Sequence, residues 1–79
     1  MNLRILLFAG LAETCGSAFL EVELPAVCTV ADLKNHLLVV QPKLKNATYR
    51  VAVNSIYAKD HQELSQGLEV ALIPPVSGG

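Results

Sequence analysis

The residues best suited to chemistry lie at the carboxyl end of the chain, in the segment Pro74-Pro75-Val76-Ser77-Gly78-Gly79. Because Gly78 and Gly79 have no side chains, a terminal carboxyl group there can approach a reacting centre through a narrow channel. Six extended residues span roughly 20 Å, which is enough to reach into the active site of another protein. The fixed φ angles of Pro74 and Pro75 hold the base of this segment extended and lower the entropic cost of ordering it. We therefore predict that residues 74–79 form an extended, flexible tail whose working group is the carboxyl of Gly79.

A carboxylate is a poor electrophile at neutral pH, so its use in group transfer requires activation, most simply by adenylation with ATP. The chain contains neither a G-x-x-x-x-G-K-[ST] nor a G-x-G-x-x-G phosphate-binding pattern. We expect a partner protein to activate the Gly79 carboxyl group with ATP. We expect this chain to have no permanently bound cofactor and no catalytic activity on its own. The alternative is an inert tail, as many termini are. The tail follows a predicted core strand and carries no charged side chain, which favours the first interpretation.

The cysteines and histidines show no metal-binding or redox motif. Cys15 and Cys28 lack CxxC or CxH spacing, and His36 and His61 have no companions. We therefore expect free or buried thiols and no metal site.

Composition narrows the class of protein. A chain of 79 residues forms one small domain, in which an enclosed cleft with a full catalytic set would compete with the core for side chains. Six Lys and Arg against seven Asp and Glu give a net charge of -1 without a basic run, so nucleic acid is not an expected partner. The hydrophobic content of 52% indicates either an unusually apolar core or an exposed patch that binds a partner protein.

The apolar run at residues 4–12 has a positive charge at its start, as a signal peptide does. Its cleavage would remove a core strand from a small domain, and the run is too short to span a bilayer. We expect no membrane segment and a cytoplasmic protein.

The tail must be positioned by a domain that we expect to occupy residues 1–73. Its first strand, Leu3–Phe8, is apolar on both faces apart from Arg4, which predicts a buried, central strand. The second, Phe19–Leu24, alternates and is half-exposed, with Phe19 as the exception on its polar face.

A helix is predicted next, because Thr29 followed by Asp32 resembles a weak capping box. Its apolar stripe consists of Val30, Leu33, Leu37 and Val40, and Pro42 ends it. The remaining elements are a strand at Arg50–Val53, a short extended piece at Ile56–Tyr57, a polar connection at Lys59–Gln66 and a last strand at Leu68–Ile73. This β-β-α-β-β order predicts an α+β roll with one helix covering one sheet face.

Several blocks of residues resemble one known family. They are Phe8-Ala9 with Glu13 and Gly16, Thr29-Val30 with Asp32-Leu33, Val51-Ala52-Val53-Asn54, and Gly67-x-Glu69-Val70-Ala71 leading into the tail. Over nearly the whole chain the sequence resembles the ubiquitin-like sulfur carriers, most closely the small subunits of molybdopterin synthase. The tail block Pro-Pro-Val-Ser-Gly-Gly is the most specific part of this resemblance, because a bare Gly-Gly end is common to the superfamily.

The resemblance implies a ubiquitin-like β-grasp, with a mixed sheet of four to five strands and one main helix on one face. It also implies that an E1-like enzyme adenylates Gly79 and that sulfur then gives a thiocarboxylate. The large catalytic subunit would receive the tail. The two kinds of subunit would form a hetero-oligomer, which is a heterotetramer in the family. Sulfur would pass there to cyclic pyranopterin monophosphate in molybdenum cofactor biosynthesis.

The family's partner-facing apolar positions correspond to Phe8, Ile73 and Tyr57. Each is also consistent with core packing, and for Tyr57 core or edge packing is the favoured interpretation. The chain departs from the family pattern at Ala12 and Leu68, which puts in doubt a surface ion pair and the last turn but not the tail chemistry. Leu68 could instead enlarge an exposed apolar face.

Three other functions remain open from the sequence. The activated glycine could be passed to lysines of target proteins, as in ubiquitin-like modifiers. It could deliver sulfur for thiamine synthesis, or the domain could be an interaction module with an inert tail.

Overall fold

The computed structural model describes residues 1–75, so the predictions for Val76, Ser77, Gly78 and Gly79 lie outside the described residues. The described residues form two α-helices, seven strands and one short 3-10 helix, η1. In chain order they are β1 Asn2–Leu7, α1 Gly10–Cys15, β2 Phe19–Glu23, β3 Cys28–Thr29, α2 Val30–Val40, η1 Pro42–Asn46, β4 Arg50–Val53, β5 Ile56–Tyr57, β6 Glu63–Leu64 and β7 Val70–Ile73.

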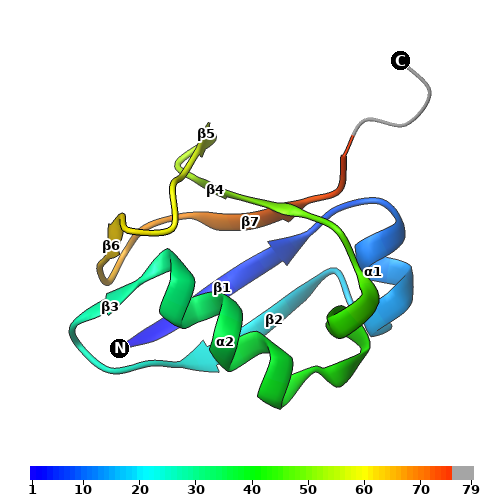
Figure 1. The fold of residues 1–79 in the computed structure, drawn as a ribbon, viewed down its shortest axis with the longest axis horizontal. Helices are drawn as coiled ribbons and strands as arrows, with labels where there is room; N and C mark the ends of the chain where they lie inside the picture. Colours follow the sequence, from blue (N-terminus) through cyan, green and yellow to red (C-terminus); the bar gives the residue numbers. More distant parts are fainter. Residues whose placement is uncertain (76–79) are drawn as a thin grey trace.

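Five strands form one mixed sheet in the order β2-β1-β7-β4-β5. The two central strands, β1 and β7, run parallel, and every other neighbouring pair is antiparallel. Helix α2 crosses one face of this sheet (Figure 1). The other face, which we call the open face, has no helix over it among the described residues. The predicted mixed sheet of four to five strands with one main helix is confirmed.

The core lies between the sheet and α2. Alternate residues of β1 point toward the helix, so Leu3, Ile5 and Leu7 are buried. Burial of this one apolar face supplies the main stabilisation. The fully or almost fully buried side chains opposite them come from α2 and η1: Val30, Leu33, Leu37 and Leu44.

Two predictions about burial are wrong. Strand β1 is not buried on both faces, because only one helix covers the sheet; Leu6 is half-buried and Phe8, just beyond the strand, is 48% exposed. Val40 does not join the buried stripe and is also 48% exposed. It lies in the last turn of α2, where Leu44 of the adjoining η1 takes the buried position.

The start of α2 has the predicted capping box, and both hydrogen bonds of the box are present. The Thr29 hydroxyl accepts a hydrogen bond from the Asp32 backbone N–H at 3.2 Å, and the Asp32 carboxylate accepts one from the Thr29 N–H at 2.9 Å. The backbone N–H groups of Thr29 and Asp32 thus have partners, which fixes where α2 begins.

Four short elements were not predicted. Helix α1 has six residues and η1 has five, so each is shorter than two turns, and β3 and β6 form a separate two-residue ladder. The connection Lys59–Gln66 is therefore not only polar chain, because Leu64 within it is buried against the core. The last strand begins at Val70 instead of Leu68, and the second ends at Glu23 instead of Leu24.

Candidate docking surface and tail attachment

The tail is attached to the centre of the sheet. Strand β7 lies between β1 and β4 and ends at Ile73, which is half-buried. Pro74 is half-buried and Pro75 is exposed. Because β7 is hydrogen-bonded on both sides, the point from which the tail leaves is fixed relative to the whole sheet.

The open face carries one row of apolar side chains that crosses all five strands. Directly paired residues point to the same side of a sheet. Leu6 is paired with both Phe19 and Ala71, and Ala52 is paired with both Ala71 and Tyr57. We call this row the open-face strip; its members are Phe19, Leu6, Ala71, Ala52 and Tyr57.

The strip has large side chains at its edges and small ones in the middle. Phe19 is 39% and Tyr57 48% exposed, whereas Ala71 and Ala52 are buried beneath their larger neighbours. An exposed apolar surface on a small protein is costly unless a partner covers it. The exposed apolar area of the strip therefore lies mainly at its two edges, on the Phe19 and Tyr57 rings.

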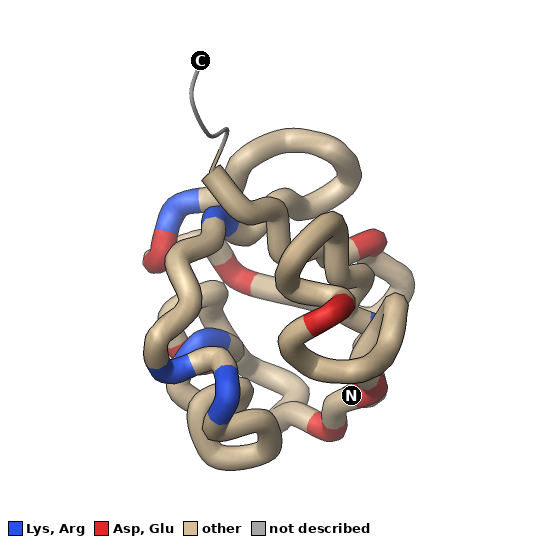
Figure 2. The backbone as a smooth tube through the Cα atoms, turned by 90° about the vertical axis from the view of Figure 1, so that its right-hand side faces the viewer, with Lys and Arg blue, Asp and Glu red and all other residues tan. Residues whose placement is uncertain are grey.

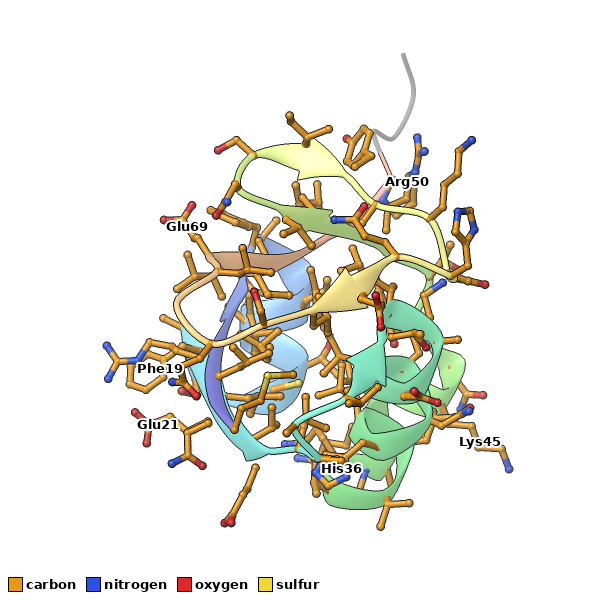
Figure 3. The ribbon with its side chains drawn as sticks, turned by 90° about the vertical axis from the view of Figure 1, so that its left-hand side faces the viewer. Phe19, Glu21, His36, Lys45, Arg50 and Glu69 are labelled. Atoms are coloured by element: carbon orange, nitrogen blue, oxygen red, sulfur yellow. The ribbon has the colours of Figure 1, made fainter. Side chains whose placement is uncertain are left out.

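An arginine stacks on each ring of the strip. The Arg4 guanidinium lies 4.4 Å from the centroid of Phe19, and that of Arg50 lies 4.0 Å from the centroid of Tyr57. Arg4 is also bound to the Glu21 carboxylate at 2.9 Å. Figure 3 shows Phe19 and Glu21 together on one side of the molecule and Arg50 on another, close to the end of β7.

The predicted partner-facing residues all lie at or near the surface. Phe8 and Tyr57 are exposed, so neither is a core residue, and Tyr57 packs at the sheet edge against Arg50 and Ala52. Ile73 is half-buried on the open face, paired with Arg50. The structure thus brings Tyr57 and Ile73 together with the base of the tail.

Sequence reasoning missed the rest of the strip. Phe19, and Arg4 which stacks on it, were noticed only as exceptions to their strands' patterns, and these exceptions were the available signal: an aromatic residue on a polar face and a cation in an apolar run. Leu6, Ala52 and Ala71 gave no signal of their own. Leu68 does not enlarge the apolar surface, because it is half-buried and packs against the core.

The thiols belong to the interior and not to the strip. Cys28 is buried and Cys15 half-buried, and neither forms a disulfide. Burial raises the pKa of both thiols, and for Cys28 the nearby Asp32 carboxylate raises it further. Within residues 1–75 no three His, Cys, Asp or Glu side chains are grouped as a metal site would require. Among the same residues, no helix has the length and apolarity needed to cross a membrane.

The sheet order, the single main helix and the tail leaving from the central strand define a ubiquitin-like β-grasp protein. The chain belongs to the ThiS family, which it matches over residues 5–79. It is 31% identical to the molybdopterin synthase sulfur carrier subunit of Arabidopsis thaliana over 81 aligned residues, which cover 100% of this chain and 84% of that protein.

Two further relatives match over their whole length. The molybdopterin synthase sulfur carrier subunit of Chlamydomonas reinhardtii is 34% identical, with 100% of both chains covered. The crystal structure of small archaeal modifier protein 1 from Haloferax volcanii has a TM-score of 0.88 at 31% identity, again with 100% of both chains covered. The resemblance inferred from the sequence is confirmed at the level of the family. The relatives include both sulfur carriers and a modifier.

Proposed function

We propose that this chain is the sulfur carrier of a molybdopterin synthase, with Gly79 as the carrier residue. The observation that carries the proposal is the similarity, over the full chain, to two proteins named molybdopterin synthase sulfur carrier subunits. The Pro-Pro-Val-Ser-Gly-Gly segment that follows β7 supplies the chemical group that such a role needs.

In this role an E1-like protein transfers AMP from ATP to the Gly79 carboxylate and releases pyrophosphate. A sulfur donor at the sulfide oxidation level then attacks the acyl carbon, AMP leaves, and a thiocarboxylate results. The thiocarboxylate sulfur is softer and more nucleophilic than a carboxylate oxygen, so it can attack cyclic pyranopterin monophosphate. Water then cleaves the acyl–sulfur bond, which leaves the sulfur on the pterin and restores the Gly79 carboxylate. ATP is a substrate of the partner and not a resident cofactor of this chain, and its use is consistent with a cytoplasmic location.

The large subunit would accept both the tail and the open-face strip. Ile73 and Pro74 connect the two, so docking of the strip places the tail at a fixed distance from the partner's active site. The substrate-positioning and acid-base groups would come from that subunit, which makes Gly79 a carrier and not a catalyst. Phe8 lies exposed just beyond β1 and is a second candidate contact.

Protein modification is the second candidate, because small archaeal modifier protein 1 matches the fold and the sequence as well as the sulfur carriers do. The same adenylated Gly79 would then form an amide with a lysine of a target protein. Conjugates detected on immunoblots, and lost when Gly79 is deleted, would support this role.

Intact-mass analysis of the protein from its native host tests the main proposal. We expect a fraction in which one oxygen at the C-terminus is replaced by sulfur, and we expect this fraction to vanish in a Gly78→Ala or Gly79-deleted variant. Gly10→Ala is the matched control, because a methyl group at Gly10 meets nothing within 4 Å. A Gly79-deleted variant that sustains normal molybdopterin synthesis would contradict the proposal.

A further inference from the structure

The two arginines of the open face have the same stacking contact but different ionic surroundings. Arg4 lies over Phe19 and is neutralised by Glu21 at 2.9 Å. Arg50 lies over Tyr57, yet no carboxylate of residues 1–75 is within 4.0 Å of its guanidinium. Within residues 1–75, one edge of the strip is therefore electrically balanced, and the other presents a cation without a carboxylate partner.

The uncompensated cation is adjacent to the tail. Arg50 is paired with Ile73, the last residue of β7 before Pro74. A protein that encloses the tail must pass over or beside this position. Stacking on Tyr57 also limits the movement of the guanidinium, so its outer N–H groups are held ready to donate.

A second cation lies at the same level of the sheet. The Ala58 N–H donates to the Val51 carbonyl at 2.8 Å, which extends the β4–β5 pairing by one residue beyond Tyr57. Lys59 follows Ala58 directly in the chain, and Arg50 directly precedes Val51. The neighbouring carboxylate, Asp60, is already engaged by Lys34 at 2.7 Å. Figure 2 shows Lys and Arg segments near the end of the described chain.

We propose that Arg50 and Lys59 form a cationic contact for carboxylates on the protein that activates Gly79. Two adjacent cations with free donors fit a cluster of Asp or Glu side chains, and a fixed guanidinium suits bidentate binding to one of them. The inference rests on the proposed function and adds the chemistry of the partner's surface.

We assign this contact to the activating protein. Each spent carrier must return to that protein through solution, and the protein must release it after one reaction. Complementary charge near the contact raises the rate of encounter and orients the tail before apolar contacts form. Both the large subunit and the activating protein would contact the apolar strip. The cation pair would favour the protein that carries acidic side chains at this position.

The test measures ATP–pyrophosphate exchange with the host's activating enzyme and the full chain as substrate. The variants are Arg50→Met, Lys59→Met and the double variant, in which Met keeps the apolar stem and removes the charge. Lys45→Met is the control, because it removes an exposed cation of η1 that is no part of the strip. Circular dichroism establishes that each variant is folded.

At low ionic strength we expect the double variant to raise the KM for the carrier by about tenfold or more with kcat unchanged, and Lys45→Met to stay within about twofold of the natural chain. At high ionic strength the difference between the double variant and the natural chain should shrink, because salt screens exposed charges. An unchanged KM in the double variant, or an equal rise in Lys45→Met, overturns the inference while leaving sulfur carriage intact. If the natural chain itself supports no exchange, the proposed function and this inference fall together.

Discussion

The side-chain amide of Gln66 makes two hydrogen bonds with the backbone of Asn2, from which it is separated by 64 positions in the chain. Its Oε1 accepts from the Asn2 N–H at 3.2 Å, and its Nε2 donates to the Asn2 carbonyl at 2.9 Å. Strand β7 pairs with β1 only from Ile5 onward. Gln66 thus replaces a strand partner at the start of β1 and ties the chain before β7 to the amino-terminal end of the sheet.

Substitution of Gln66 by Ala should lower the free energy of unfolding by about 1 kcal/mol, because two exposed hydrogen bonds are exchanged for bonds to water. Gln66→Glu can still accept from the Asn2 N–H but cannot donate to its carbonyl, so we expect a smaller loss. Urea unfolding measures both. Equal stability of all three proteins would show that the amide contributes nothing.

Ala9 is expected to be a strained residue. Its φ of 48° and ψ of -128° form a conformation that glycine adopts more readily than alanine, and it turns the chain from β1 into α1. Ala9→Gly should therefore raise stability by about 1 kcal/mol, and the thermal midpoint by about 4–8 °C. Ala47, at φ -91° and ψ 145°, is the matched control, since Gly there should lower stability.

The capping box gives a third prediction. Thr29→Ala removes the acceptor for the Asp32 N–H and should cost about 1 kcal/mol of stability. Thr29→Ser keeps the hydroxyl and should cost much less. If Ala and Ser behave alike in thermal unfolding, the loss comes from the methyl group and not from the cap.

Stability should fall at alkaline pH. Burial raises the pKa of Cys28 above its ordinary value of 9.0, and burial likewise raises the pKa of Cys15 and Tyr49. The unfolded chain therefore loses these protons at a lower pH than the folded chain does. The stability that the protonated groups contribute is fully present below their ordinary pKa and is lost as the pH rises through their pKa in the folded state. Cys28→Ala and Cys28→Ser should both show a shallower decline of the free energy of unfolding above about pH 8.5. If the free energy of unfolding of both variants falls as steeply with pH as that of the natural chain, groups other than Cys28 cause the decline.

The open-face strip should matter for docking more than for folding. Leu6 is half-buried between Phe19 and Ala71, so Leu6→Glu places a charge in the middle of the expected contact. We expect loss of co-purification with the large synthase subunit and retention of the folded state. Val39→Glu, on the 77% exposed outer side of α2, is the control. Loss of the partner in both variants would argue against a specific role of the strip.

The sequence predicted the main elements because their local signals agree with their tertiary roles. Alternation in Phe19–Glu23 and the Thr29–Asp32 cap act within one element, and the structure contains both. The short elements were missed because their stability is not local. Strand β6 has only two residues, and it exists because Leu64 is buried and its backbone pairs with β3, far earlier in the chain.

By itself, the sequence supports the prediction made for residues 74–79, since glycine's lack of a side chain and proline's fixed φ are properties of single residues. It also determined the one-helix α+β class. Only the tertiary structure decided which residues form the surface beside the tail. The row from Phe19 to Tyr57 and the difference between Arg4 and Arg50 arise from strand order and register, which bring together residues that lie in four separate parts of the chain.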